Sequence, residues 1–389
     1  MNYFIIAGEA SGDMHAADLI HHLRRLDTNA HITGLGGDLM QQQGAHIIVH
    51  YRQMAFMGIW NVVRHHKDIT HNFRTTQHAL LHNKPDALLL IDYPSFNLRI
   101  AKWAKHHLPH TRTIYYISPK LWAWKSWRIR SIRRYIDDMY TIFPFETNYY
   151  AQRHYHVNYV GNPLIDHINQ HPDLQQSRTD FCHHNGLDPD RPIIALLPGS
   201  RTQEITRCLP RMIQAAETTG HNYQIAISTA PGQDTHTYTR AGANTHTLIN
   251  GHTYALLKHA QAAIVNSGTA TLETALIGTP QVVVYNPILP HLASLVKPLV
   301  IKTQHVSLVN IIAGQQVVKE LIGAHFTTHN TATELNRLLT DTHYTDTMRH
   351  HYTHLTHTLT TQHGAAATAA TAIINSLNNT NTTPHLAHP

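Results

Sequence analysis

Short apolar runs alternate with longer amphipathic stretches along the first half of the chain. Residues 3–7 are uniformly apolar, and residues 13–26 carry apolar side chains at helical spacing. Comparable apolar runs follow at residues 31–35, 86–91, 113–117, 139–143 and 157–160. Uniformly apolar strands that are separated by helices are typical of a parallel sheet covered on both faces.

The alternation is interrupted by a polar stretch and then resumes. Residues 166–191 are polar and contain prolines and glycine, which favours an interdomain connection. A second series of apolar runs then occupies residues 193–197, 223–228, 262–266 and 281–285. We therefore predict an α/β protein of two doubly wound, Rossmann-like domains that face each other across a cleft. Their expected bounds are 1–165 and 192–344, followed by closing helices over 345–377 and a disordered tail over 378–389.

Composition narrows the class of protein. Only 14% of the 389 residues are charged, 37 are His, and the net charge of +6 counts those His as neutral. This basic balance suits an anionic partner, whether a phosphorylated ligand, an anionic membrane face or a nucleic acid. Two cysteines cannot build a disulfide framework, and no signal peptide or transmembrane segment is visible. A soluble protein of a reducing, cytoplasmic compartment is therefore expected.

The second series of strands carries a candidate phosphate site at Ser200 and Arg201. These residues follow Gly199 directly after the apolar run 193–197, so they should lie at the carboxyl edge of the sheet, where open α/β sheets bind ligands. A guanidinium there could neutralise a diphosphate with two parallel hydrogen bonds. The alternative is a plain turn with a surface arginine.

A second anion site is indicated at Ser267, Gly268 and Thr269. They lie between an apolar run and the start of a predicted helix, whose N-terminal N–H groups attract anions. Glu273, in the first turns of that helix, could accept hydrogen bonds from ribose hydroxyls. The alternative is capping of the helix by Ser267 or Thr269 with no ligand bound.

Asp92 is the candidate general base. It ends the apolar run 86–91, and partial burial at a sheet edge would suit its carboxylate to proton transfer. It could equally cap the following turn. The turn over residues 8–13 is similar to a phosphate-binding loop but matches neither the Gly-x-Gly-x-x-Gly nor the Walker pattern, so a mononucleotide is not expected there.

Two segments combine tryptophan with apolar or basic residues and favour contact with lipid. Tryptophans among cations fit an interface with anionic headgroups. The same pattern could stack nucleic-acid bases, or it could be buried aromatics beside a solvated basic helix. The candidate contact residues are Phe56, Met57, Ile59, Trp60, Trp122, Trp124, Trp127, Arg128 and Arg130.

The many histidines do not indicate a metal centre. His351, His354 and His357 recur at helical spacing, yet no His-Glu-x-x-His and no Cys-x-x-Cys pair occurs. The Asp-x-Asp at residues 188–190 follows no apolar run and is better explained as a turn. No metal and no cofactor are expected.

Taken in order, these motifs resemble those of the lipid-A-disaccharide synthases, a family of inverting glycosyltransferases. The resemblance spans nearly the whole chain, and the number of motifs in one order makes it specific. It rests on the segments GEASGD (8–13), MGI (57–59), IDYP (91–94), SPKLWAW (118–124), FPFE (143–146), GNPL (161–164), LPGSR (197–201), SGT (267–269) and VSLVN (306–310).

The resemblance implies a fold of the GT-B type with the active site between two Rossmann-like domains. It implies transfer from UDP-2,3-diacylglucosamine to the 6-hydroxyl of 2,3-diacylglucosamine 1-phosphate, with Asp92 as base and without a metal. It also implies active-site positions of unassigned role at Glu9, Ser11 and Asn310. Peripheral association with the cytoplasmic face of the inner membrane is expected, without a nucleic-acid partner. The oligomeric state stays open, a homodimer included.

Three positions depart from the family pattern, and two rival functions stay open. Ser95 stands where the family often has Asp, Asn162 where it often has His, and Val309 where it often has Pro. The first departure leaves Asp92 as the remaining candidate base. The rivals are a UDP-sugar 2-epimerase and a non-catalytic peripheral membrane or RNA-binding protein.

Overall fold

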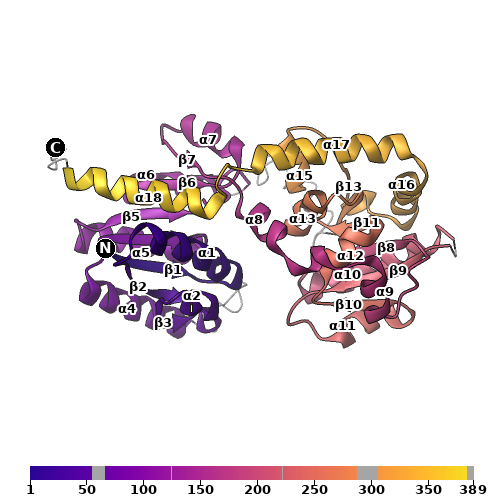
Figure 1. Ribbon diagram of the computed structural model, residues 1–389, viewed down its shortest axis with the longest axis horizontal. Coiled ribbons are helices and arrows are strands. Elements are labelled where there is room, and N and C mark those ends of the chain that lie inside the picture. The colour runs from indigo at the N-terminus through magenta and orange to yellow at the C-terminus, as the bar shows by residue number, and fades with distance from the viewer. Residues whose placement is uncertain (55–65, 124, 221, 287–304, 383–389) are drawn as a thin grey trace. The chain divides into compact units, whose positions relative to one another are not determined.

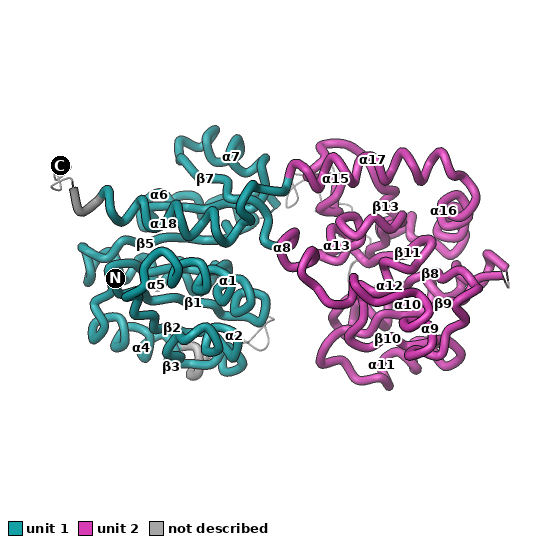
Figure 2. The backbone as a smooth tube through the Cα atoms, viewed as in Figure 1, with its two compact units in different colours: residues 1–163, 359–389 teal, residues 164–358 magenta. Residues whose placement is uncertain are grey.

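The chain forms two compact units in the computed structural model, which describes residues 1–54, 66–123, 125–220, 222–286 and 305–382 (Figure 1). Unit 1 comprises residues 1–163 together with 359–389, and unit 2 comprises residues 164–358 (Figure 2). Each unit is built on one parallel sheet with helices packed on it. This confirms the predicted α/β class with two parallel-sheet domains.

Over its described residues, unit 1 has a seven-stranded parallel sheet in the order β3-β2-β1-β4-β5-β6-β7. The strands are β1 (Asn2–Ala7), β2 (His31–Gly36), β3 (His46–His50), β4 (Ala87–Ile91), β5 (Arg112–Tyr116), β6 (Asp138–Thr141) and β7 (Asn158–Tyr159). The helices are α1 (Ala10–Leu26), α2 (Asp38–Gln42), α4 (His66–Asn83), α5 (Pro94–His107), α6 (Ile129–Tyr135), α7 (Pro144–Ala151) and α18 (Ala365–Thr382). Short 3₁₀ turns occupy Tyr51–Gln53 and Ser126–Arg128.

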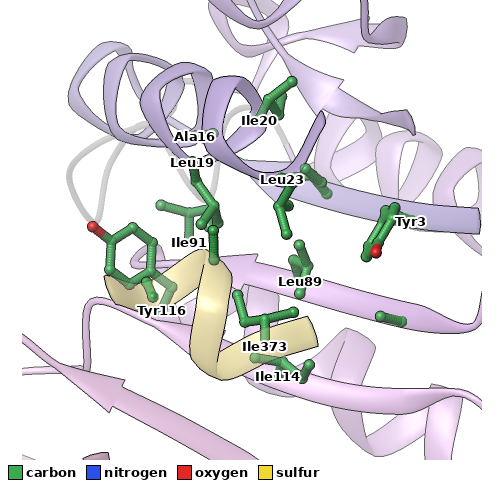
Figure 3. Packing of buried hydrophobic residues seen from close by; sticks show 14 of the residues in the cluster. Tyr3, Ala16, Leu19, Ile20, Leu23, Leu89, Ile91, Ile114, Tyr116 and Ile373 are labelled. Carbon is green, nitrogen blue, oxygen red and sulfur yellow. The ribbon is translucent and has the colours of Figure 1, made fainter. Parts of the chain in front are cut away.

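Both faces of this sheet are buried, as its uniformly apolar strands require. In β1, Tyr3 and Ile5 belong to one apolar cluster, whereas Phe4 and Ile6 belong to another on the opposite face. The alternation follows from the two-residue side-chain period of a strand. Figure 3 shows the first cluster, in which α1, β4 and α18 meet.

Helix α18 joins unit 1 although it comes from the end of the chain. Ala369, Ala370 and Ile373 are fully buried against α1 in the first cluster. Its small and aliphatic side chains allow close packing of the two helices. The last helix of the expected closing segment is therefore part of the first unit, and residues 378–382 continue it as helix instead of beginning a disordered tail. Residues 383–389 lie outside the described chain.

Unit 2 has, in the part described, a six-stranded parallel sheet in the order β10-β9-β8-β11-β12-β13. The strands are β8 (Ile193–Leu197), β9 (Gln224–Thr229), β10 (Thr247–Asn250), β11 (Ala260–Asn266), β12 (Gln281–Tyr285) and β13 (Lys319–Ile322). The helices are α8 (Pro163–Gln170), α9 (Arg178–Asn185), α10 (Thr202–Glu217), α11 (Thr235–Arg240), α12 (Thr253–His259), α13 (Thr269–Ile277), α15 (Leu308–Ala313), α16 (Thr328–Thr340) and α17 (Thr342–Leu359). Short 3₁₀ turns occupy Pro172–Gln175, Ala243–Thr245 and Gly323–His325.

The polar stretch 166–191, expected as a connection, belongs to unit 2 and is largely structured. It contains most of α8 and the whole of α9. Phe181 and Cys182 of α9 are fully buried in the core of unit 2. These two side chains, together with the Arg178 guanidinium, which donates to the carbonyls of Pro189, Arg191 and His259, dock a short helix whose other residues are polar.

Candidate active site

Asp92 lies at the carboxyl edge of the unit 1 sheet, immediately after β4. Asp92 and Tyr93 both adopt left-handed backbone conformations, with φ of 41° and 46°. Neighbouring groups hold this turn: the Asp92 N–H donates to the Tyr116 carbonyl at 3.1 Å, and the Asn97 amide donates to the Asp92 carbonyl at 2.7 Å. The Tyr115 hydroxyl donates to the same carbonyl. A conformation that is rare for non-glycine residues persists here because its surroundings determine it, which is common at functional sites.

The carboxyl group of Asp92 is partly buried, and its pKa is raised. Burial raises its pKa, whereas the positive charge of Lys120 and a hydrogen bond from the Tyr93 N–H lower it. Among the described residues, no side chain donates a hydrogen bond to this carboxylate. A partly desolvated carboxylate of raised pKa is a stronger base than an ordinary aspartate.

The turn after β1 lies beside the turn after β4, because these two strands are paired with Ala7 opposite Ile91. A Cβ atom at Gly8 would lie 2.3 Å from the Tyr93 ring, so only glycine permits this approach. Glu9 is the N-cap residue of α1, and its charge raises the pKa of Tyr93, after the larger effect of burial. The structure therefore brings Glu9 near the Asp92 turn. Ser11 is exposed in the first turn of α1.

In unit 2, the two predicted phosphate turns lie at one edge of the sheet. They follow β8 and β11, which are paired with Leu197 opposite Val265. Gly199 has φ of 111°, and a Cβ atom there would lie 2.5 Å from a Glu204 carboxylate oxygen and 2.7 Å from the Asn266 amide nitrogen. Glycine is thus required for the first turn to pass this close to the second.

Arg201 is exposed at the start of α10. Its guanidinium pairs with Glu204 at 3.0 Å, while the Ser200 and Arg201 N–H groups donate to the other oxygen of that carboxylate at 3.1 and 3.3 Å. The Gln233 amide donates to the Ser200 carbonyl at 3.0 Å. These contacts shape the turn and leave the arginine side chain accessible to an anion.

Gly268 precedes α13 as its N-cap residue, and no side chain caps the helix. The Ser267 N–H donates to the Val284 carbonyl at 2.8 Å, which ties this turn to β12. Thr269 begins the helix and is exposed. The structure thus lacks the capping by Ser267 or Thr269 that was the alternative to ligand binding, and the first N–H groups of α13 keep their affinity for an anion.

Glu273 lies one turn further along α13. It accepts a hydrogen bond from the Tyr254 hydroxyl at 2.9 Å, and burial raises its pKa while that bond lowers it. Its carboxylate is therefore fixed in direction by Tyr254.

The described part of the chain contains neither a metal-ligating cluster nor a membrane-spanning helix. No group of three His, Cys, Asp or Glu side chains there could hold a metal ion. Likewise, none of its helices is both long and apolar enough to cross a bilayer.

Comparisons with known proteins place the chain in a family. The lipid-A-disaccharide synthetase family profile matches residues 3–374. The lipid-A-disaccharide synthase of Trichlorobacter lovleyi is 37% identical over 357 residues, which cover 90% of this chain and 91% of that protein. That of Acidobacterium capsulatum is 39% identical, covering 87% of this chain and 86% of that protein. The chain belongs to the lipid-A-disaccharide synthase family. It is a glycosyltransferase of lipid A biosynthesis.

Solved structures that resemble this family member show the fold alone. A UDP-GlcNAc 2-epimerase from Neisseria meningitidis bound to UDP-GlcNAc has a TM-score of 0.67 at 11% identity, over 97% of this chain and 100% of that one. The calicheamicin glycosyltransferase CalG4 has a TM-score of 0.59 at 15% identity, over 98% and 99%. The epimerase fold is shared, but sequence identity assigns the chain to the synthases, which argues against both rival functions.

Trp122, expected at the lipid interface, is instead buried in unit 1. It is 7% exposed, its indole N–H donates to Glu146 Oε1 at 3.1 Å, and its ring packs edge-on against Phe145. The Trp122 side chain therefore does not face lipid, because it is buried and its indole N–H donates its hydrogen bond to a buried carboxyl group. Trp127, by contrast, is 65% exposed, and Arg130 is exposed on α6. Phe56, Met57, Ile59, Trp60 and Trp124 lie outside the described residues.

Glu146 was not identified as a site residue from the sequence. Its side chain is buried and also accepts hydrogen bonds from the Ser118 hydroxyl at 2.6 Å and the Phe143 N–H at 3.2 Å. Burial raises the pKa of Glu146 to about 7, against the lowering effect of these bonds. The signal was present: Glu146 is the third residue of a helix that begins with Pro144, a capping-box position.

Asn310, a family-implied active-site residue, is completely buried and bonded within its own loop. Its amide donates to the Val318 carbonyl at 2.9 Å and to Glu320 at 2.8 Å, and its carbonyl oxygen accepts from the Val317 and Val318 N–H groups at 2.7 and 2.9 Å. These bonds make Asn310 a residue that shapes the loop between α15 and β13, and its place in the active site stays a prediction from the family resemblance.

Proposed function

We infer that this family member transfers 2,3-diacylglucosamine from UDP-2,3-diacylglucosamine to the 6-hydroxyl of 2,3-diacylglucosamine 1-phosphate. The products would be the β-1,6-linked lipid A disaccharide 1-phosphate and UDP. The observation that carries this proposal is Asp92, a partly desolvated carboxylate at the end of a central strand in a chain 37% identical to a lipid-A-disaccharide synthase. Unit 1 would take the acceptor and unit 2 the donor.

Asp92 would remove the proton of the acceptor 6-hydroxyl as that oxygen attacks the anomeric carbon of the donor. The new carbon–oxygen bond forms while the bond to UDP breaks, and its electron pair leaves with the diphosphate. Displacement in one step inverts the anomeric carbon, so one base is sufficient. The raised pKa of Asp92 favours this proton transfer.

The departing diphosphate gains negative charge, and unit 2 offers positive potential for it. The exposed guanidinium of Arg201 would exchange Glu204 for the diphosphate, and the uncapped N-terminus of α13 at Ser267, Gly268 and Thr269 would donate N–H groups. Glu273, held by Tyr254, would accept from the ribose hydroxyls. Glu9 lies near the base, at the N-cap of the helix whose first turn carries Ser11.

An exposed aromatic-basic surface on unit 1 supports peripheral binding to the cytoplasmic face of the inner membrane. It consists of Trp127, Arg130, Arg133 and Arg134, all exposed on or beside α6. An exposed indole with guanidinium groups suits an anionic headgroup layer, and binding there would bring the enzyme to its acylated substrates.

The decisive experiment mixes the purified protein with both lipid substrates in detergent micelles containing EDTA and detects the disaccharide phosphate by mass spectrometry. Asp92→Asn should lower the rate at least a hundredfold with an unchanged melting temperature. Asp86→Asn, at the opposite end of β4 and exposed, is the matched control and should stay fully active. An epimerised UDP-sugar, or full activity of Asp92→Asn, would contradict the proposal.

Membrane binding is tested separately by sedimentation with anionic liposomes, with and without RNA as competitor. Replacing Trp127 and Arg130 together by Ser and Gln should abolish sedimentation without unfolding the protein, because both side chains are exposed. Equal sedimentation of this variant, or displacement by RNA, would contradict the membrane role.

A further inference from the structure

Two cations near Asp92 have no carboxylate partner among the described residues, and the proposed reaction uses neither. Lys120 is exposed in the loop after β5, and its positive charge acts on Asp92. Arg128 is half-buried, and its guanidinium donates to the Ser95 hydroxyl at 2.9 Å. An arginine that is partly desolvated without an acidic partner has unused capacity for an anion.

The backbone places both cations at the same edge as the base. Strands β4 and β5 are paired with Ile91 opposite Tyr116, so the loop that carries Lys120 leaves the sheet beside Asp92. Ser95, the partner of Arg128, lies three residues after Asp92, in the first turn of α5. No side chain caps α5, so its N-terminus adds positive potential to that of the two cations.

The loop that carries Lys120 is anchored on both sides. The Tyr150 hydroxyl donates to the Pro119 carbonyl at 3.3 Å, Leu121 is 2% exposed, and Trp122 is bonded to Glu146. Of residues 118–122, Lys120 alone is exposed, and its four neighbours are buried. The backbone that carries the lysine is therefore positioned in advance, which reduces the part of the ordering entropy lost when the cation binds an anion.

We propose that Lys120 and Arg128 form the subsite for the phosphate group of the sugar acceptor, beside the base that takes the proton of its 6-hydroxyl. The inference rests on the proposed function. In a hexose 1-phosphate, C1 bears the phosphate and C5 bears the 6-hydroxymethyl group. Both carbons bond to the ring oxygen. The phosphate and the 6-hydroxyl therefore lie on neighbouring parts of the sugar, as Lys120, Arg128 and Asp92 do at the sheet edge.

Kinetics with two acceptors test the subsite. The acceptor 2,3-diacylglucosamine 1-phosphate is compared with the same lipid lacking its phosphate, in Lys120→Met, Arg128→Met and native protein. Each variant should raise the KM for the phosphorylated acceptor about tenfold or more, as loss of a charge-assisted contact does. At a pH high enough for Asp92 to stay ionised without Lys120, the KM for the UDP-sugar and the rate with the dephosphorylated acceptor should stay unchanged. Lys102→Met, which removes an exposed cation of α5, is the matched control and should behave as native.

Equal losses with both acceptors would overturn the proposal. If Lys120→Met loses activity equally with both acceptors and the acidic limb of its pH–rate profile moves to higher pH, the lysine only keeps Asp92 ionised. Weaker sedimentation of Lys120→Met or Arg128→Met with anionic liposomes, with KM values unchanged, would assign the cations to the membrane instead. Arg128→Lys, which keeps the charge, should restore part of the lost affinity.

Equilibrium binding separates failure of this inference from failure of the proposed function. Binding of each acceptor to Asp92→Asn protein is measured in matched micelles, without turnover. At least tenfold tighter binding of the phosphorylated acceptor, lost in the Lys120→Met background, supports the subsite even if native protein transfers no sugar. Equal binding of the two acceptors would refute it even if the transferase activity is established.

Discussion

Glu146 provides a quantitative test of whether burial sets the pKa of a carboxyl group in unit 1. The residue is 1% exposed, and burial raises the pKa of its carboxyl group to about 7 from an ordinary value of 4.5. Below pH 4.5 the group is protonated in the folded and the unfolded chain, and above pH 7 it is charged in both. Between these limits the folded chain binds more protons, so its stability falls as pH rises.

The size of the effect follows from the two pKa values. A separation of about 2.5 units corresponds to about 3 kcal/mol of stability, lost between pH 4.5 and pH 7. Glu146→Gln keeps the shape of the side chain and can still accept from Ser118 and Trp122, but it does not ionise. The free energy of unfolding of the native protein, relative to this variant, should therefore fall by about 3 kcal/mol over that interval.

Urea unfolding followed by tryptophan fluorescence measures this difference at steps of half a pH unit from 4 to 8. All five tryptophans belong to unit 1, so the signal reports on the unit that contains Glu146. Subtracting the two curves removes the titration of the histidines common to both proteins. Parallel curves for native protein and Glu146→Gln would refute the claim that burial governs this group.

Three further changes have defined outcomes. Gly199→Ala should destabilise unit 2 by about 1–3 kcal/mol, because φ is positive there and the new Cβ atom would clash with Glu204 and Asn266. Chemical denaturation followed by circular dichroism measures the loss of stability, and a variant as stable as the native protein would contradict the close approach. Asn310→Ala should lower the free energy of unfolding by about 3 kcal/mol, because backbone groups of Val317 and Val318 lose their hydrogen-bond partners. A reduced kcat with an unchanged melting temperature would instead assign Asn310 to catalysis. Arg201→Met should raise the KM for the UDP-sugar about tenfold. It should change the free energy of unfolding by less than about 0.5 kcal/mol, because the ion pair with Glu204 is exposed. An unchanged KM would exclude Arg201 from the donor site.

The central strands could be predicted from the sequence, and several edge strands could not. Strands such as β1, β4, β8 and β11 are buried on both faces and read as apolar runs. Strands β3, β10 and β13 lie at sheet edges and carry polar residues, as in His46–His50 and Lys319–Ile322, so they lack that signature. Periodicity likewise predicted helix near the end of the chain, but it holds no information on which unit α18 packs against.

Site residues at strand ends could also be predicted from the apolar runs in the sequence. Once β4, β8 and β11 are recognised, parallel pairing places Asp92, Arg201 and Ser267 at carboxyl edges without further information. The environment of Trp122 and Asn310 depends instead on hydrogen bonds to Glu146 and Glu320. Such partners come from other elements, and a motif alone does not show whether its tryptophan faces solvent or a buried carboxyl.

Asp92 and Glu146 show how one physical cause can serve two purposes in the same unit. Burial raises the pKa of both carboxyl groups. Glu146 accepts hydrogen bonds from Ser118, Trp122 and the Phe143 N–H, so its raised pKa affects stability and its geometry fixes the loop over residues 118–122. Asp92 has its backbone pinned, but no side chain of the described residues donates to its carboxylate. Asp92, which is held through its main chain, therefore keeps its carboxylate available to accept a proton. Glu146, which is held through its carboxylate oxygens, shapes the neighbouring loop.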